Sequence, residues 1–210
     1  MSRLSRLQRL LLAAMPCLGQ VPLLPAQDAA SALITQCGEA DDLLHQRKFA
    51  EAEKAYRAML PAAQRDLPPA SPLNLRIRNN MAVALSSQGK TSEAEAAHRA
   101  TIAILERAPQ AEKTALLVCK NNLGDTLFAQ RKYREAEAVH REVYTERQTV
   151  LGKEHRDTLV SGYNLANCLY QLKRRDEARD ITRFITPTAK RTLGATHAYT
   201  VLFAKLDSKL

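Results

Sequence analysis

Apolar residues recur at helical spacing in two successive stretches near the middle of the chain. The first stretch, residues 113–130, carries an apolar stripe made of Leu116, Leu117, Leu123, Leu127 and Phe128. The second stretch, residues 133–150, follows the polar segment 130–132 and carries Ala136, Val139, Val143 and Val150. Such spacings place side chains on one face of an α-helix. The pattern predicts two helices joined by a tight turn.

The same helix pair returns along the chain at intervals of 42 residues. The triplet Glu-Ala-Glu marks it at residues 51–53, 93–95 and 135–137, and becomes Glu-Ala-Arg at residues 177–179. We call positions one repeat apart a column. Three columns of matching residue type are Lys48, Lys90, Lys132 and Arg174; Leu43, Leu85, Leu127 and Leu169; and Arg57, Arg99, Arg141 and Arg183.

The repeat fixes the expected elements. First helices are predicted at residues 31–46, 73–88, 113–130 and 156–172, and second helices at 49–64, 91–107, 133–150 and 175–191. A terminal helix is predicted within 197–210. Prolines gather between the first two copies and predict a loop at 65–71, while Pro61 and Pro187 predict a kink or an early stop in their helices.

Small residues form two further columns, where neighbouring helices are expected to approach closely. These columns are Ala52, Ala94, Ala136 and Ala178 on second helices, and Ala40, Ala82, Gly124 and Ala166 on first helices. One helix pair cannot bury both of its apolar faces, so the copies are expected to stack. Seven glycines in 210 residues is a low content and agrees with an all-α fold.

The third copy contains a series of short motifs that occur together in a known type of helical repeat. They are Asn121-Asn122-Leu123-Gly124, Gln130-Arg131-Lys132-Tyr133, Glu135-Ala136-Glu137, Leu151-Gly152, His155 and Asp157-Thr158-Leu159. These motifs resemble the tetratricopeptide repeat (TPR) family, and more narrowly its kinesin light chain type. The resemblance implies a right-handed superhelix of about four helix-turn-helix repeats with a C-terminal capping helix. The solenoid domain would span 30–210, with repeats near 30–66, 73–108, 113–151 and 156–192 and a partial one at 197–210.

The resemblance also implies that the first helices line a concave groove. Asparagine is a mediocre helix former, yet it recurs on these helices, and its amide can bond the backbone of an extended ligand. The predicted groove residues are Arg76, Asn79, Asn80, Val83, Asn121, Asn122, Asp125, Tyr163, Asn164 and Asn167. The alternative is that the asparagines bond between adjacent helices and only stabilise the stack.

The sequence predicts a non-enzymatic adaptor that binds a partner protein or peptide. It contains no glycine-rich phosphate loop, no Gly-x-Ser-x-Gly and no spacing typical of metal ligands, so neither a cofactor nor a metal site is predicted. His98 and His140 share a column with Tyr56 and are expected to pack between helices, and Cys37, Cys119 and Cys168 to be buried. The alternative function is a structural or oligomerising module, or part of a longer array, without a peptide site.

The net charge of +9 does not by itself indicate nucleic-acid binding. One basic column lies at the break inside each helix pair and the other on the second helices, which face outward in this repeat class, so a solvated outer surface and no specific nucleic-acid binding are expected. Residues 1–29 are treated as a separate N-terminal segment, in which Arg3, Arg6 and Arg9 alternate with leucines and no acid precedes Asp28. This composition is typical of an organellar transit peptide. A secretory signal within 1–26, or an uncleaved lead on an otherwise cytoplasmic protein, remains open, and the apolar part is too short to span a membrane.

Overall fold

A computed structural model describes residues 25–108 and 113–210, and within these ranges every regular element is a helix. The predicted targeting segment lies almost entirely outside the described residues. The first helices of the successive pairs are α2 (Pro25–His45), α4 (Pro72–Ser87), α6 (Lys113–Ala129) and α8 (Arg156–Gln171). The second helices are α3 (Phe49–Asp66), α5 (Thr91–Arg107), α7 (Tyr133–Val150) and α9 (Arg175–Thr192), and α10 (Ala198–Asp207) follows them.

The predicted bounds agree with the observed helices with two exceptions. Helix α2 begins at Pro25, before the predicted residue 31. Pro61 and Pro187 lie inside α3 and α9, and both helices continue beyond them, so the expectation of an early stop was wrong. Buried residues on the C-terminal side of each proline, Ala63 and Ala189, hold the following turn in the helix.

The turn inside each pair explains two of the sequence columns. The backbone amide of the basic residue donates to the carbonyl of the leucine five positions earlier, as in Lys90 to Leu85 at 3.0 Å and Lys132 to Leu127 at 3.0 Å. The residue directly before the basic residue has a left-handed backbone, with a φ of 79° at Gly89. This is the geometry of a helix C-terminus closed by a residue in the left-handed region. All four pairs therefore turn in the same way.

The turn between successive pairs is also repeated in the second half of the chain. His155 caps α8, because its Nδ1 accepts a hydrogen bond from the amide of Asp157 at 3.1 Å. His197 caps α10 in the same manner, with 3.2 Å to the amide of Tyr199. The two histidines are thus local helix caps.

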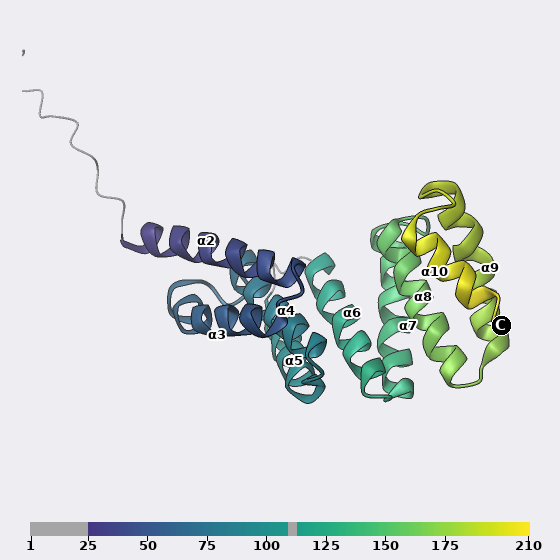
Figure 1. Ribbon diagram of the computed structural model, residues 1–210, viewed down its shortest axis with the longest axis horizontal. Coiled ribbons are helices and arrows are strands. Elements are labelled where there is room, and N and C mark those ends of the chain that lie inside the picture. Colours follow the sequence, from purple (N-terminus) through teal and green to yellow (C-terminus); the bar gives the residue numbers. More distant parts are fainter. Residues whose placement is uncertain (1–24, 109–112) are drawn as a thin grey trace, which may run out of the picture.

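The helices stack in chain order from α2 to α10 (Figure 1). Each helix packs against the next, and first helices of neighbouring pairs also contact one another. Within the described ranges, the backbones of second helices from neighbouring pairs do not approach one another closely, and these helices are linked by long side chains, as in the ion pair of Arg57 with Glu93 at 2.7 Å. The stack is therefore tighter on the side of the first helices, which form its concave face. The four alanines of the second-helix column are all fully buried, as predicted.

An ion-pair ladder joins the second helices on the outer side. Glu95 accepts hydrogen bonds from Arg99 at 2.9 Å and from Lys132, in the turn of the next pair, at 2.8 Å. Glu53 is bound in the same way by Arg57 at 2.8 Å and Lys90 at 2.7 Å. Much of the basic charge is thus neutralised by acidic residues of the same chain. The Glu-Ala-Glu triplet recurs every 42 residues because its last glutamate forms the same ion pairs in successive repeats.

Candidate functional site

All ten predicted groove residues lie on the first helices α4, α6 and α8, but they differ in exposure. Arg76 and Asp125 are exposed, and Asn121 is buried. The other seven are half-buried, namely Asn79, Asn80, Val83, Asn122, Tyr163, Asn164 and Asn167. The predicted column spacing therefore brings these residues to one face of the stack.

The asparagine ladder bonds from one first helix to the preceding one. The Nδ2 atom of Asn80 donates to Asp41 Oδ1 at 2.8 Å, and that of Asn122 donates to Asn79 Oδ1 at 2.9 Å. In the next step, Asn164 Nδ2 donates to Asp125 Oδ1 at 2.9 Å. The ladder amides therefore tie the stack together, as the structural alternative predicted. Groove lining by the remaining carbonyl oxygens stays a prediction.

Two aspartates anchor this ladder from within the concave face. Asp41 is buried and accepts hydrogen bonds from the Tyr56 hydroxyl, from Asn80 and from Arg76. Asp125 occupies the same column in the third pair and keeps a half-exposed side chain, while desolvation by the surrounding helices raises the pKa of its carboxyl. Between them, the second pair has Val83 in this column.

One hollow of about 210 Å³ opens between α4 and α6 on the concave face. It is lined by Val83, Ser86, Ser87, His98, Asn122, Asp125 and Thr126. His98 comes from α5 and is 1% exposed, and neither of its ring nitrogens has a hydrogen-bond partner among the described residues. Burial lowers the pKa of His98 to about 4, so its ring is neutral at pH 7.

A second hollow of about 250 Å³ lies between α8 and α10, further along the same face. Its lining is Tyr163, Asn167, Tyr170, Gln171, Leu202, Lys205, Leu206 and Lys209. The guanidinium of Arg175 lies 5.8 Å from the centre of the Tyr170 ring, which fixes one wall. This end of the groove combines aromatic faces with two ammonium groups.

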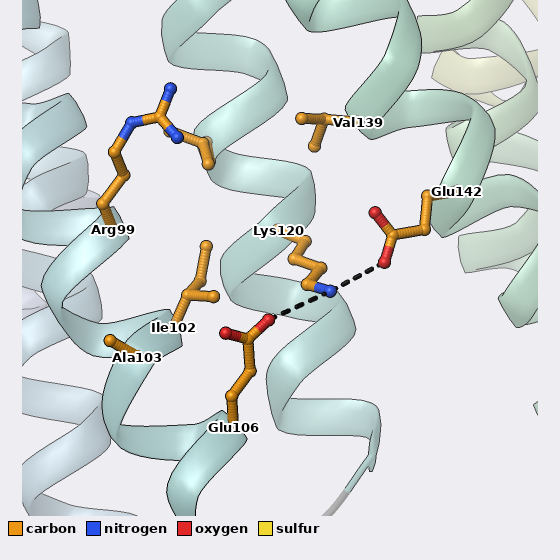
Figure 2. A pocket seen from close by; sticks show the side chains of 8 residues that line it. Arg99, Ile102, Ala103, Glu106, Lys120, Val139 and Glu142 are labelled. Atoms are coloured by element: carbon orange, nitrogen blue, oxygen red, sulfur yellow. Dashed lines mark hydrogen bonds and ion pairs between the residues drawn. The ribbon is translucent and has the colours of Figure 1, made fainter.

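A third hollow, of about 350 Å³, lies on the side of the second helices between α5 and α7 (Figure 2). Lys120 of α6 reaches into it, with its Nζ 2.7 Å from Glu142 Oε1 and 3.4 Å from Glu106 Oε1. Burial lowers the pKa of Lys120, but the two carboxylates outweigh it and the pKa is raised overall. The ammonium and the two carboxylates neutralise one another and leave little unpaired charge for a binding partner. The hollows on the concave face are therefore better candidates for a binding site.

Sequence reasoning found five of the residues that line the two concave hollows and missed the rest. Val83, Asn122 and Asp125 meet in one hollow, and Tyr163 and Asn167 in the other. His98 was assigned to packing, which its burial confirms, but its place at the base of a hollow was not foreseen. The sequence signal that would have revealed this position lies in the column facing His98. There the second pair has Val83, where the first and third pairs have Asp41 and Asp125.

Within the described residues, no helix has both the length and the apolarity needed to cross a membrane. The same part of the chain contains no cluster of His, Cys, Asp or Glu side chains arranged to hold a metal ion. The three described cysteines are buried and free, as predicted.

Comparison with known proteins identifies the fold and the family. The tetratricopeptide repeat model matches residues 30–107 and 115–182. Crystal structures of nearly identical TPR-like repeats from Podosopora anserina, named as a kinesin light chain, share 20% identity at a TM-score of 0.73 and cover 85% of this chain and 84% or 85% of that one.

Another similar structure is BtubC (BKLC) from P. vanneervenii, with 18% identity, a TM-score of 0.65, and coverage of 89% of this chain and 85% of that chain. No curated protein sequence matches. TPR repeats are in general protein-interaction modules without catalytic activity. The fold therefore resembles solved kinesin light chain repeats, and the match to the repeat model, with the helix pairs and the 42-residue period, shows that this chain belongs to the tetratricopeptide repeat family.

Proposed function

We propose that the chain is a non-enzymatic adaptor that binds an extended segment of a partner protein along the concave face of its first helices. The observation that carries this proposal is the pair of hollows on that face, one between α4 and α6 and one between α8 and α10. An extended peptide sends alternate side chains to one side, so spaced hollows suit it.

The ladder asparagines support the same proposal in a secondary way. Their Nδ2 atoms are held by the preceding helix, which fixes the orientation of each amide. The Oδ1 atoms of Asn122 and Asn164 accept no hydrogen bond from the described residues. Two preoriented acceptors one repeat apart are suited to backbone N–H groups of a ligand.

Selection from a display library of random short peptides, using the complete chain as bait, tests the proposal. Val118 is 42% exposed on α6 in the column of Arg76, and Val150 is 38% exposed at the end of α7. We expect Val118→Arg to weaken the selected peptides by about tenfold or more, and Val150→Arg to leave them unchanged, when binding is followed by fluorescence anisotropy. Failure to retain any peptide, or equal loss in both variants, would overturn the proposal.

A second candidate function, an oligomerising module, has an observation of its own. Helix α10 exposes Val201 at 55%, Leu202 at 38% and Tyr199 at 36%, and no described helix packs on it after α8 and α9. A hollow of about 720 Å³ lies beside it, between α9 and α10. Sedimentation velocity separates the two candidates. Growth with concentration that Val201→Asp abolishes would favour stacking, and a discrete monomer at all concentrations would favour the adaptor.

A further inference from the structure

Each helix pair buries one polar side chain of its second helix, and in the second pair that side chain has no hydrogen-bond partner among the described residues. The column Tyr56, His98, His140 and Thr182 places a polar side chain from each second helix behind the concave face. Tyr56 donates to Asp41, and His140 Nε2 lies 3.5 Å from Asp125 Oδ1. In both cases the partner is an aspartate of the facing column.

Thr182 of the fourth pair has a different partner, since it donates to Asp207 at 2.6 Å. His98 of the second pair has none among the described residues, because the facing column holds Val83. A side chain that is 1% exposed and leaves both ring nitrogens unpaired is costly. The open space beside it, about 210 Å³, is several times the roughly 30 Å³ that one water occupies in the liquid.

The walls of this hollow restrict what it can accept. Asp125 on one side accepts hydrogen bonds through its carboxylate, and in this ionised form its charge disfavours a ligand carboxylate. A neutral imidazole has one donor and one acceptor nitrogen, and Ser86 and Ser87 add hydroxyl groups. An ammonium group only donates hydrogen bonds, so it could not accept one from the N–H of His98 or from a serine hydroxyl. An apolar side chain would leave His98 unpaired.

A primary carboxamide carries a donor and an acceptor in one planar group and meets both requirements. We propose that the hollow at His98 is a specificity pocket for an Asn or Gln side chain of the bound segment. The NH₂ group donates to Asp125, and the carbonyl oxygen accepts from His98 or a neighbouring hydroxyl. The pocket rests on the proposed function, because it receives a side chain of the peptide that the concave face holds.

The test uses a peptide selected on the complete chain, together with its single-substitution series measured by fluorescence anisotropy. At one position, Gln or Asn should bind about tenfold tighter than Leu or Glu, the difference expected for a site whose polar groups lose their partner. Val83→Asp restores the aspartate of the column, gives His98 an internal partner and fills the pocket, so this preference should vanish. Val150→Asp adds the same charge outside the groove and should keep the preference.

His98→Phe is a second variant that conserves shape and removes both nitrogens. We expect it to reverse the preference, with Leu or Met now bound more tightly than Gln at the same position. Circular dichroism establishes that each variant is folded. If peptides bind but no position prefers a carboxamide, or if the preference survives in both folded variants, the pocket assignment is wrong while the adaptor proposal stands. If no peptide binds, both proposals fail.

Discussion

Acid should destabilise this chain through His98, and the size of the effect follows from its burial. The ring is 1% exposed, and burial lowers its pKa to about 4 from 6.5. Between these two values the unfolded chain binds a proton that the folded chain refuses, so stability falls as the pH falls. The stability is fully present above about pH 6.5 and is lost as the pH falls through about 4. Each pKa unit is worth about 1.4 kcal/mol, which gives about 3 kcal/mol in total and about 2 kcal/mol between pH 7 and pH 5.

The assay compares the free energy of unfolding in urea of the wild type and of His98→Phe at pH 7 and pH 5, followed by circular dichroism. Titrating groups far from His98 are common to both proteins and cancel in the difference. We expect the difference to shift by about 2 kcal/mol in favour of the variant at pH 5. The exposed His45 provides the control, because His45→Phe should produce no such shift. A His98→Phe difference that is equal at both pH values would refute the reasoning.

Three further stability predictions follow from the packing and are measured by urea or thermal unfolding. Ala94→Leu and Ala136→Leu should each cost about 1–3 kcal/mol, because both alanines are fully buried at helix contacts, and unchanged midpoints would contradict this. Glu95→Gln should cost about 1–2 kcal/mol at pH 7 by weakening bonds to two cations. Those cations lower the pKa of Glu95 to about 2. The stability advantage of the wild type is therefore present above pH 4.5 and should shrink as the pH falls towards 2. Equal stability of the wild type and Glu95→Gln at pH 7 would refute this prediction. Gly124→Ala should cost about 1–3 kcal/mol, because the new Cβ would lie 2.6 Å from the buried imidazole of α7, whereas Gly38→Ala meets open space and should stabilise α2 by up to about 1 kcal/mol. A loss of equal size in both glycine variants would contradict that comparison.

The fold could be predicted from the sequence because the repeat supplies each helix boundary several times. The basic residue that closes each pair recurs at 48, 90, 132 and 174, and its amide bonds the leucine column in every copy. The start of α2 was missed because residues before 31 have no counterpart in an earlier copy. Proline at the first turn of a helix, as at Pro25, is permitted and gives no stop signal.

The asparagine column shows where residue type alone stops being sufficient. The spacing placed Asn80, Asn122 and Asn164 on one face, but not the partner that each amide chooses. In the structure each Nδ2 donates to the preceding first helix, which a sequence cannot distinguish from donation to a ligand. Replacing the three residues by Ala is therefore expected to lower the thermal midpoint as well as to weaken peptide binding.

The hollow at His98 was hidden for a different reason. It depends on three helices at once: α5 supplies the unpaired ring, α4 lacks the aspartate that would pair with it, and α6 supplies the opposite wall. Each residue taken alone has an ordinary explanation as a core or surface position. Only the comparison of Val83 with Asp41 and Asp125, combined with the packing, separates this pair from the others.

Photocrosslinking tests the central claim, that a partner segment lies on the concave face, most directly. The photoreactive residue benzoylphenylalanine replaces Val118 on first helix α6, or the exposed Ala138 on second helix α7, in the complete chain. Each protein is irradiated with a peptide selected for binding to the wild type, and the crosslinked product is mapped by mass spectrometry. The account predicts a peptide adduct from position 118 and none from position 138. An adduct formed from position 138 alone, or equally from both positions, would contradict it.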